Sequence, residues 1–234
     1  MANADEMKRV AAQAAAELVE AGMIVGLGSG STAALAVSAI GARVAAGLRI
    51  TGIPTSEDTA ALARSLGIPL STLDQHDRID LTIDGADEVE RRTLNVIKGR
   101  GGALLREKIV ASASRRLVIV ADESKLVDRL CPAGQPIPVE IVPFGWPSTA
   151  RRLEGIGAKG TLRLAGDGRT FVTDGSHYIL DCVFPPFDSA AALAGSLDRI
   201  VGVVEHGLFL GMATEAIVGR ADGGLEHLRP GAAA

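Results

Sequence analysis

The sequence predicts an α/β fold, a parallel sheet flanked by helices, that carries a second, smaller α+β domain. Apolar runs suited to buried strands alternate with helical periodicity over residues 7–121. Five prolines between Cys131 and Pro147 then break this pattern, and shorter strands follow them. The 234 residues, 47% of them hydrophobic, are sufficient for the buried core of such a molecule.

Helices and strands alternate in the first half of the chain. The first helix is indicated by apolar residues at helical spacing, Met7, Val10, Ala11, Ala14 and Leu18. Gly22 ends it, and an apolar strand follows over 23–27. Further helices are expected over 32–46, 56–66 and 103–114, and further strands over 48–54, 68–73, 79–83 and 117–121.

The second half of the chain has shorter elements. Strands are expected over 161–164, 171–173 and 178–183, with Asp174-Gly175 as a hairpin turn between the last two. A helix over 189–199 and a strand over 203–209 complete the small domain, and residues 212–219 return to the first sheet. The larger domain is therefore expected to comprise 1–130 plus 209–234, and the smaller one 131–208.

Composition and charge exclude several classes of protein. A net charge of −4 without a basic block argues against nucleic-acid binding, and 3% aromatic residues leave little for base stacking. The chain begins with charged residues instead of the apolar stretch of a signal peptide, and no run is long enough to span a bilayer. Cys131 and Cys182 lack the spacing of a metal site or a disulfide scaffold. We expect a cytoplasmic protein that binds neither nucleic acid nor membrane.

A glycine-rich loop, Gly26-Leu-Gly-Ser-Gly-Ser-Thr-Ala33, follows a predicted strand and opens a predicted helix. Its backbone amides and the helix dipole form an anion site, to which Ser31 and Thr32 add hydroxyl donors. The glycines alone could serve only a tight turn, but the run of hydroxyls at Ser29, Ser31 and Thr32 favours phosphate binding.

The same loop also fits the dinucleotide fingerprint G-x-G-x-x-A, which needs an acidic residue at the end of the second strand. That strand ends in Pro54-Thr-Ser56, and Glu57 lies past the required position in a helix. We therefore expect a phosphomonoester rather than NAD.

Two further runs, Asp84-Gly-Ala-Asp-Glu-Val89 and Lys98-Gly-Arg-Gly-Gly-Ala-Leu-Leu-Arg-Glu-Lys108, combine carboxylates, a lysine and glycines. Carboxylates can move protons, whereas a lysine and bare amides can stabilise an oxyanion. Asp84 directly follows the strand over 79–83, at the sheet edge where α/β folds bind ligands, although Asp-Gly-Ala-Asp is also ordinary turn chemistry. Glu107, near the start of a helix, suits both a general base and a solvated residue.

These motifs resemble those of ribose-5-phosphate isomerase, type A, a metal-free family that interconverts ribose 5-phosphate and ribulose 5-phosphate. Three later segments agree with the family in the same order, Ala121-Asp-Glu-Ser-Lys125, Pro138-Val-Glu-Ile-Val-Pro-Phe-Gly145 and Gly207-Leu-Phe209. The resemblance thus covers almost the whole chain. It implies a Rossmann-like domain with a small ferredoxin-like lid, a role in the non-oxidative pentose phosphate pathway, and a homodimer or tetramer.

The resemblance also implies roles for individual residues. Glu107, in an unchanged Arg-Glu-Lys motif, matches the family's proton-abstracting glutamate, and Asp84, Asp87 and Lys98 match its other catalytic positions. The implied substrate-binding residues are Ser29, Gly30, Ser31, Thr32, Asp84, Gly85, Ala86, Asp87, Lys98, Gly99, Arg100, Gly101 and Lys125. Lys8, on the first helix, could approach the same phosphate, but a solvated surface lysine is the favoured interpretation.

The chain departs from the family pattern in the loop and in the lid. Ser29 stands where the family usually has threonine, and Asp174-Gly-Ser-His177 stands where Asn-Gly-Asn is common. Since both serine and threonine offer a hydroxyl, we expect the contact of Ser29 with the phosphate to survive. The second departure concerns the geometry of the lid hairpin.

The expected chemistry is a proton transfer through an enediolate. Asp87, with Asp84, would assist opening of the sugar ring, and Glu107 would then move a proton from C2 to C1. Lys98 and the amides of Gly99–Gly102 would stabilise the oxyanion. We expect no metal or cofactor, since the four histidines are too scattered in sequence to suggest a metal cluster, at His76, His177, His206 and His227.

Three alternatives stay open. Another sugar-phosphate enzyme on a related scaffold, such as a glucosamine-6-phosphate deaminase or a coenzyme A transferase, is disfavoured by the complete Lys98–Lys108 run. A non-catalytic sugar-phosphate sensor would be expected to carry a DNA-binding segment and to lack the carboxylates. An NAD oxidoreductase would change the cofactor's fluorescence on titration.

Overall fold

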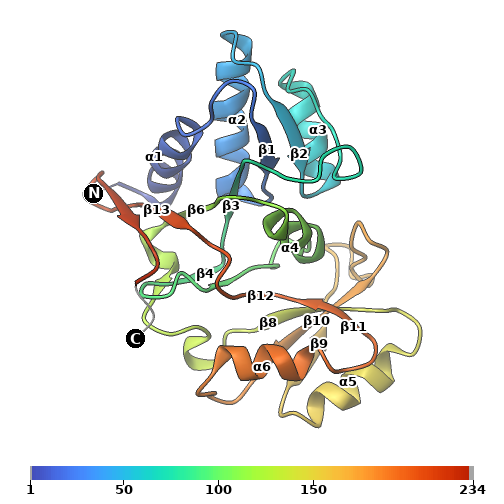
Figure 1. Cartoon of the computed structure of the whole chain (residues 1–234). Helices are drawn as coiled ribbons and strands as arrows, with labels where there is room; N and C mark the ends of the chain where they lie inside the picture. The colour runs from blue at the N-terminus through green and yellow to red at the C-terminus, as the bar shows by residue number, and fades with distance from the viewer. Residues whose placement is uncertain (1, 232–234) are drawn as a thin grey trace.

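A computed structural model describes residues 2–231; residues 1 and 232–234, the ends of the predicted larger domain, lie outside this range. Its largest sheet has the strand order β14 (Leu225–Leu228), β13 (Glu215–Gly219), β6 (Leu117–Asp122), β3 (Leu81–Gly85), β1 (Ile24–Leu27), β2 (Thr51–Pro54) (Figure 1). All neighbours pair in parallel except β13 and β14. The predicted parallel sheet is confirmed.

Helices cover one face of this sheet. They include α1 (Ala4–Ala16), α2 (Ser31–Ala45) and α3 (Glu57–Ser65). Two of them begin at side chains that accept a hydrogen bond from the first turn, Asn3 before α1 and Ser56 before α3. Val118 and Val120 of β6 pack in the same core as α1 and α2. The alternate residues of β6 point to the opposite face, where they meet Phe209, so the strand is buried on both sides.

A small second sheet and helix α4 (Leu104–Ser112) cover the opposite face. The strands of this sheet lie in the order β12 (Leu208–Phe209), β5 (Val96–Ile97), β4 (Glu88–Glu90), β7 (Leu126–Val127). The sequence analysis predicted β12 only as the end of the strand over 203–209 and did not predict β4, β5 and β7, because strands of two or three residues leave no readable periodicity.

The remaining strands form a third sheet, which is accompanied by two helices. In chain order they are β8 (Ile137–Ile141), α5 (Trp146–Glu154), β9 (Lys159–Leu162), β10 (Tyr178–Val183), α6 (Ala190–Leu197) and β11 (Val203–His206). The strands are antiparallel in the order β11-β8-β10-β9, which is the ferredoxin-like arrangement. Figure 1 shows α5 and α6 on the side of this sheet away from α4, which contacts β8 and β11. Helix α4 therefore lies between two sheets.

Several predicted elements differ in the structure. The strand expected over 68–73 is wrong, since only Leu70 makes a bridge, to Gly52; Pro69 beside it has no N–H to donate. The strand over 171–173 is also wrong, because these residues belong to the connection between β9 and β10. Asp174-Gly175 does lie in a turn, in which Thr173 N donates to His177 O.

Other differences concern residues 137–154 and 203–209, and the end of β3. The strand expected over 203–209 is split between two sheets at Gly207, whose carbonyl accepts from Lys98 N. Strand β8 and helix α5 form in the proline-rich segment where no element was predicted. Strand β3 extends to Gly85, so Asp84 lies within it. Among residues 2–231, none of the helices combines the length and apolar character needed to cross a membrane.

Candidate active site

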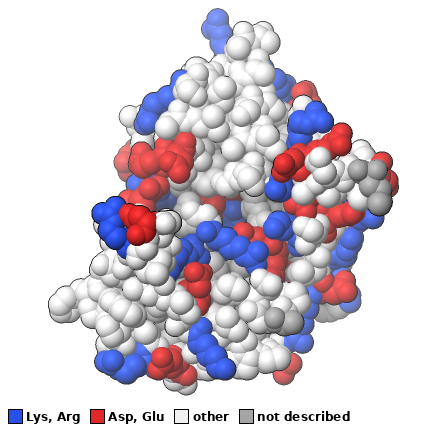
Figure 2. All heavy atoms as spheres, turned by 180° about the vertical axis from the view of Figure 1, so that it is seen from behind, with Lys and Arg blue, Asp and Glu red and all other residues white. Residues whose placement is uncertain are grey.

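The candidate site is a pocket of about 130 Å³ beyond the carboxyl ends of β1 and β3, beside the start of α4. It brings together most of the predicted residues, since it is lined by Lys8, Ser29, Gly30, Ser31, Thr32, Gly85, Ala86, Asp87, Lys98, Gly99, Gly101, Glu107 and Lys125. From behind, charged side chains of both signs gather across the hollowed middle of the molecule (Figure 2). Because positive and negative side chains are mixed there, an anion is attracted at individual positions rather than over the whole surface.

Lys98 lies at the centre of a buried charge cluster. Its Nζ lies 3.0 Å from Asp84 Oδ2 and 3.2 Å from Glu107 Oε1, and it donates to Gly85 O at 2.6 Å. The three residues are 3%, 1% and 5% exposed in the order Lys98, Asp84, Glu107. Burial opposes the charge of Lys98, but the two carboxylates outweigh it and raise the pKa of the lysine. Lys98 therefore stays cationic between two acids.

Glu107 has the properties of a proton acceptor whose second oxygen is free. Burial raises its pKa to about 8, although Lys98 acts in the opposite direction. Its Oε2 atom is buried and has no hydrogen-bond partner among the described residues. A buried polar atom without a partner is uncommon and often marks a catalytic group. Burial is therefore the main cause of the raised pKa of Glu107.

Asp84 ties the glycine loop to the charge cluster. Its Oδ1 accepts from Ser29 N at 3.1 Å and from Gly85 N at 2.8 Å, while Oδ2 faces Lys98. Burial raises the pKa of Asp84, and Lys98 opposes that rise. Asp84 does not line the pocket. Its place behind Lys98 suits a role in orienting the lysine.

The loop over 99–102 offers two free amides. The amide of Gly102 donates to Gly99 O at 3.0 Å, and that of Arg100 donates to Asp87 Oδ2 at 2.9 Å. Within residues 2–231, no acceptor faces the amides of Gly99 and Gly101, and both residues line the pocket. Of the four amides predicted as oxyanion donors, these two are therefore available. The Arg100 side chain instead donates to Gln135 Oε1, outside the pocket.

In the glycine-rich loop over 26–33, the Ser29 hydroxyl is already bonded, whereas the amides at the start of α2 are free. Ser29 Oγ donates to Ser56 Oγ at 2.8 Å and contacts the Thr55 and Thr59 hydroxyls at 2.6 and 3.2 Å. A hydroxyl has one hydrogen, so Ser29 in this arrangement holds the loop and cannot also donate to an anion. Helix α2 begins at Gly30 without a side-chain cap, which leaves its first amides free for a ligand.

The end of β2 bears on the dinucleotide alternative. Thr55 and Ser56 occupy the place of the ribose-binding acid and bond to Ser29. The nearest acid in sequence, Glu57, accepts instead from Arg106 at 2.8 Å. The geometry thus agrees with the preference for a phosphomonoester.

The sequence analysis missed several residues of the site. Lys8 lines the pocket with its side chain 20% exposed, so the expectation of a solvated surface lysine is wrong. The ring of Phe209 lies 5.8 Å from Lys98 Nζ and 4.9 Å from Lys108 Nζ. Arg163 bonds to the carbonyls of the loop over 99–102. No local signal marks Arg163, because its partners are far away in sequence, whereas Phe209 belongs to the segment Gly207-Leu-Phe209 that resembles the family but was given no role there.

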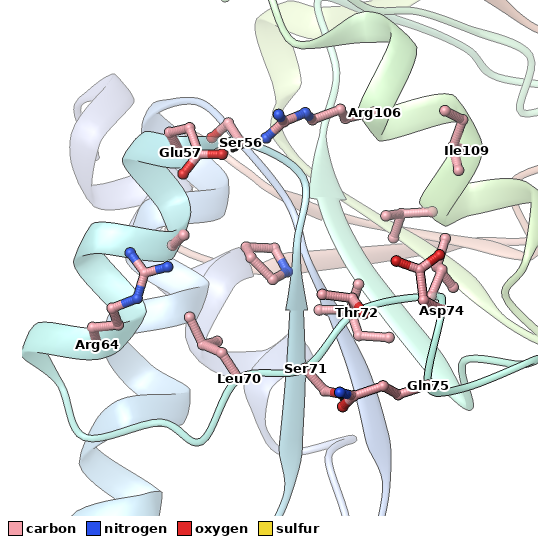
Figure 3. Close-up of a pocket in the computed structure, with 15 residues that line it drawn as sticks. Ser56, Glu57, Arg64, Leu70, Ser71, Thr72, Asp74, Gln75, Arg106 and Ile109 are labelled. Carbon is pink, nitrogen blue, oxygen red and sulfur yellow. Dashed lines mark hydrogen bonds and ion pairs between the residues drawn. The ribbon is translucent and has the colours of Figure 1, made fainter. Parts of the chain in front are cut away.

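A larger hollow, of about 730 Å³, lies between α3, the segment over 70–75 and α4 (Figure 3). Its labelled charged groups do not converge: Arg64 projects from α3, Asp74 lies across the hollow, and Arg106 turns toward Glu57. It lacks the free glycine amides and the buried acid–lysine cluster of the smaller pocket. Chemistry rather than size therefore identifies the candidate site.

Three histidines of the described residues pair with a carboxylate, and one of them, His206, lies beside two. Ligand atoms of Asp198, Glu205 and His206 lie within 4.8 Å of one another. However, Lys108 Nζ lies against this group, donating to Glu205 Oε1 and to His206 O, each at 2.6 Å. An ammonium there repels a cation, so we interpret the group as a charge network behind α4.

The geometry can now be compared with that of known proteins. A protein-family model described as Ribose 5-phosphate isomerase A (phosphoriboisomerase A) matches residues 51–223. The ribose-5-phosphate isomerase A of Gloeobacter violaceus is 58% identical over 229 residues, which cover 98% of each chain. The chain belongs to the ribose 5-phosphate isomerase A family. Like its relatives in that family, it is an isomerase.

Solved structures of the family agree in fold. The ribose 5-phosphate isomerase from Plasmodium falciparum matches with a TM-score of 0.90 and 39% identity, covering 96% of this chain and 98% of that chain. A D-ribose-5-phosphate isomerase in complex with phospho-erythronic acid matches with a TM-score of 0.92 and 38% identity, covering 97% and 100%. The family resemblance predicted from sequence is thus confirmed.

Proposed function

We propose that this chain interconverts D-ribose 5-phosphate and D-ribulose 5-phosphate by proton transfer through an enediolate, with Glu107 as the base. Membership of the family supplies the reaction, and the geometry of the pocket supplies roles for the residues. The single observation that carries these roles is the buried, unpartnered Oε2 of Glu107 next to Lys98. It combines a proton acceptor with a cation at one point.

Binding starts with the phosphate in the loop that opens α2. The free amides at its start and the hydroxyls of Ser31 and Thr32 would hold the phosphate oxygens. Lys8 and Lys125 line the same pocket and add positive charge. Asp87, exposed to the pocket, would assist opening of the sugar ring. We also expect phospho-erythronic acid, bound by a solved relative, to bind here.

Proton transfer follows at the other end of the pocket. Glu107 Oε2 takes the proton from C2, the electron pair of that C–H bond forms a double bond between C2 and C1, and the π pair of the C1 carbonyl moves onto its oxygen. Lys98 and the free amides of Gly99 and Gly101 would stabilise the resulting oxyanion. Glu107 then returns the proton to C1, and the proton of the C2 hydroxyl passes to the C1 oxygen, so that C2 becomes the ketone and C1 carries the hydroxyl. The atoms balance without an external reductant or oxidant.

The direct test is to mix purified, chelator-treated protein with ribose 5-phosphate and to follow formation of the ketose. Formation of ribulose 5-phosphate by the wild type, lost in Glu107→Gln, would support both the reaction and the base. Glu154→Gln, at an exposed position on α5, is the matched control and should keep full activity. Binding of the sugar phosphate without turnover by the wild type would overturn the proposal and favour a sensor.

Cytoplasmic localisation and assembly as a homodimer or tetramer are further proposals. Cys131 and Cys182 are unpaired in the structure, as suits a reducing compartment. Light scattering during gel filtration would measure the assembly directly, and a monomer at working concentration would contradict it. Cell fractionation with an antibody would test the compartment.

A further inference from the structure

Arg163 lies in the connection after β9, a strand of the third sheet (β11-β8-β10-β9). Its side chain reaches the loop over 99–102. Its Nη1 donates to Gly99 O at 2.7 Å and to Arg100 O at 3.1 Å. The side chain is 12% exposed, so water competes little for these bonds. Arg163 does not line the pocket, and its guanidinium therefore acts on the loop rather than on a ligand.

Two neighbours hold the guanidinium in place. Asp181 on β10 accepts from Arg163 Nε at 2.9 Å and from its Nη2, in a two-pronged pair. The ring of Phe171 lies 5.9 Å from the guanidinium carbon. Phe171 also lies against Gly102, where a Cβ atom would come within 2.4 Å of the ring. Arg163 and Phe171, both in the connection between β9 and β10, thus contact the loop at three of its four residues.

The planar peptide bond transmits this hold to the pocket. In a trans peptide, the carbonyl oxygen and the following N–H point in opposite directions. Arg163 holds the carbonyl of Arg100, and the N–H of the same peptide unit is that of Gly101, one of the two free amides. In the preceding unit Arg163 holds Gly99 O, while the Arg100 amide is held by Asp87. Arg163 therefore holds both peptide planes from outside the pocket, and Asp87, which lines the pocket, also holds the first of them.

We propose that Arg163, held by Asp181, is a positioning residue that aims the Gly101 amide at the oxyanion of the reaction. The inference rests on the proposed function, since it assigns a use to the amide in that reaction. Without Arg163, the peptide planes of the loop over 99–102 are free to rotate, so the Gly101 amide no longer points at the oxyanion. The loop over 26–33, which would bind the phosphate, is unaffected. A positioning defect of this kind weakens the transition state more than the ground state.

The test compares turnover with the binding of two anions in Arg163→Ala. We expect kcat to fall about 100-fold with KM changed less than about threefold. Inorganic phosphate, which reports the loop that opens α2, should bind as to wild type. Phospho-erythronic acid, which adds a carboxylate at the reacting end, should bind about tenfold more weakly. Arg163→Lys, which keeps the charge without the planar fork, should recover only part of kcat.

Control variants separate positioning from folding. Arg169→Ala removes an arginine from the same connection that is 85% exposed and pairs with Asp167, and it should behave as wild type. If Arg163→Ala does not fold, Asp181→Asn tests the same point, with a smaller loss of kcat expected. Unchanged kcat in a folded variant, or parallel loss of phosphate binding and kcat, would overturn the inference. Failure of the wild type to isomerise ribose 5-phosphate would instead overturn the proposed function.

Discussion

Lys98 Nζ lies 3.2 Å from Glu107 Oε1, and both side chains are buried. The pair places a permanent cation beside the group proposed to take the proton. As negative charge moves from the carboxylate to the sugar oxygen, it stays close to the same ammonium. The lysine can therefore stabilise the charge before and after transfer, while the second oxygen of Glu107 stays free to accept the proton.

Glu107→Gln keeps the size of the side chain but removes the proton acceptor. We expect kcat to fall by roughly 10²- to 10⁴-fold, as is typical for loss of a general base, with little change in substrate binding. Stopped or coupled assays give kcat, and calorimetry gives the binding constant. A variant with near wild-type turnover would show that another group takes the proton.

The activity should depend on pH through Glu107. Its pKa is raised to about 8, so the acceptor form is lost as the pH falls below that value. We expect kcat/KM to fall by about tenfold for each pH unit on the acid side. A profile recorded from about pH 6 to about pH 10 covers the transition. A plateau extending down to the acid end would contradict the assignment.

The same pKa shift should appear in stability. The folded state holds the proton on Glu107 more tightly than the unfolded chain, where the pKa is near its ordinary value of 4.5. The stabilisation by protonation is therefore complete below that value and is lost as the pH rises through about 8. Urea unfolding should show wild type losing stability relative to Glu107→Gln over this interval. A constant difference would argue that Glu107 is not protonated in the folded protein.

Lys98→Ala leaves Asp84 and Glu107 without their shared cation. We expect a loss of about 3 kcal/mol of transition-state stabilisation, which is a fall of roughly 100-fold in turnover, with a smaller change in KM. The variant should also be less stable at high pH, where both buried acids must ionise without a partner. Equal small changes in kcat and KM would indicate a structural lysine.

Thr32→Ala addresses the phosphate loop. The hydroxyl would donate to a charged oxygen, a bond worth about 1.5–3 kcal/mol, so KM should rise about tenfold or more with kcat nearly unchanged. Ser38→Ala, on the same helix, is the control, because that hydroxyl donates to Ala34 O and faces away from the pocket. A fall in kcat alone would place Thr32 at the reacting end instead.

The sequence predicted those parts of the site that depend on short runs. Asp84, Lys98 and Glu107 stand in two dense motifs, and their meeting follows from the strand, turn and helix that carry them. The fold class was predictable for the same reason, since buried parallel strands have a strong local signature. The division into 1–130 plus 209–234 and 131–208 stays a prediction.

Contacts between distant segments were not predictable in this way. Arg163 meets carbonyls more than 60 residues earlier in the chain, which have no side-chain identity to read. Lys8 was expected at the surface, yet α1 packs where the residue reaches the pocket. Strand β4 is short and is held by partners on both sides, so tertiary pairing rather than local propensity forms it.

Helix α4 contacts the smaller sheet on one side and contributes Val110 and Ala111 to the cores of the larger domain on the other. Glu107, the proposed base, is therefore carried by a helix that packs against both the largest sheet and the third sheet. A peripheral domain can be replaced by a different module without affecting an active site. Replacement of the third sheet would instead change the orientation of Glu107. Changes of substrate range are more accessible in the loops at the open side of the pocket, which carry no such double duty.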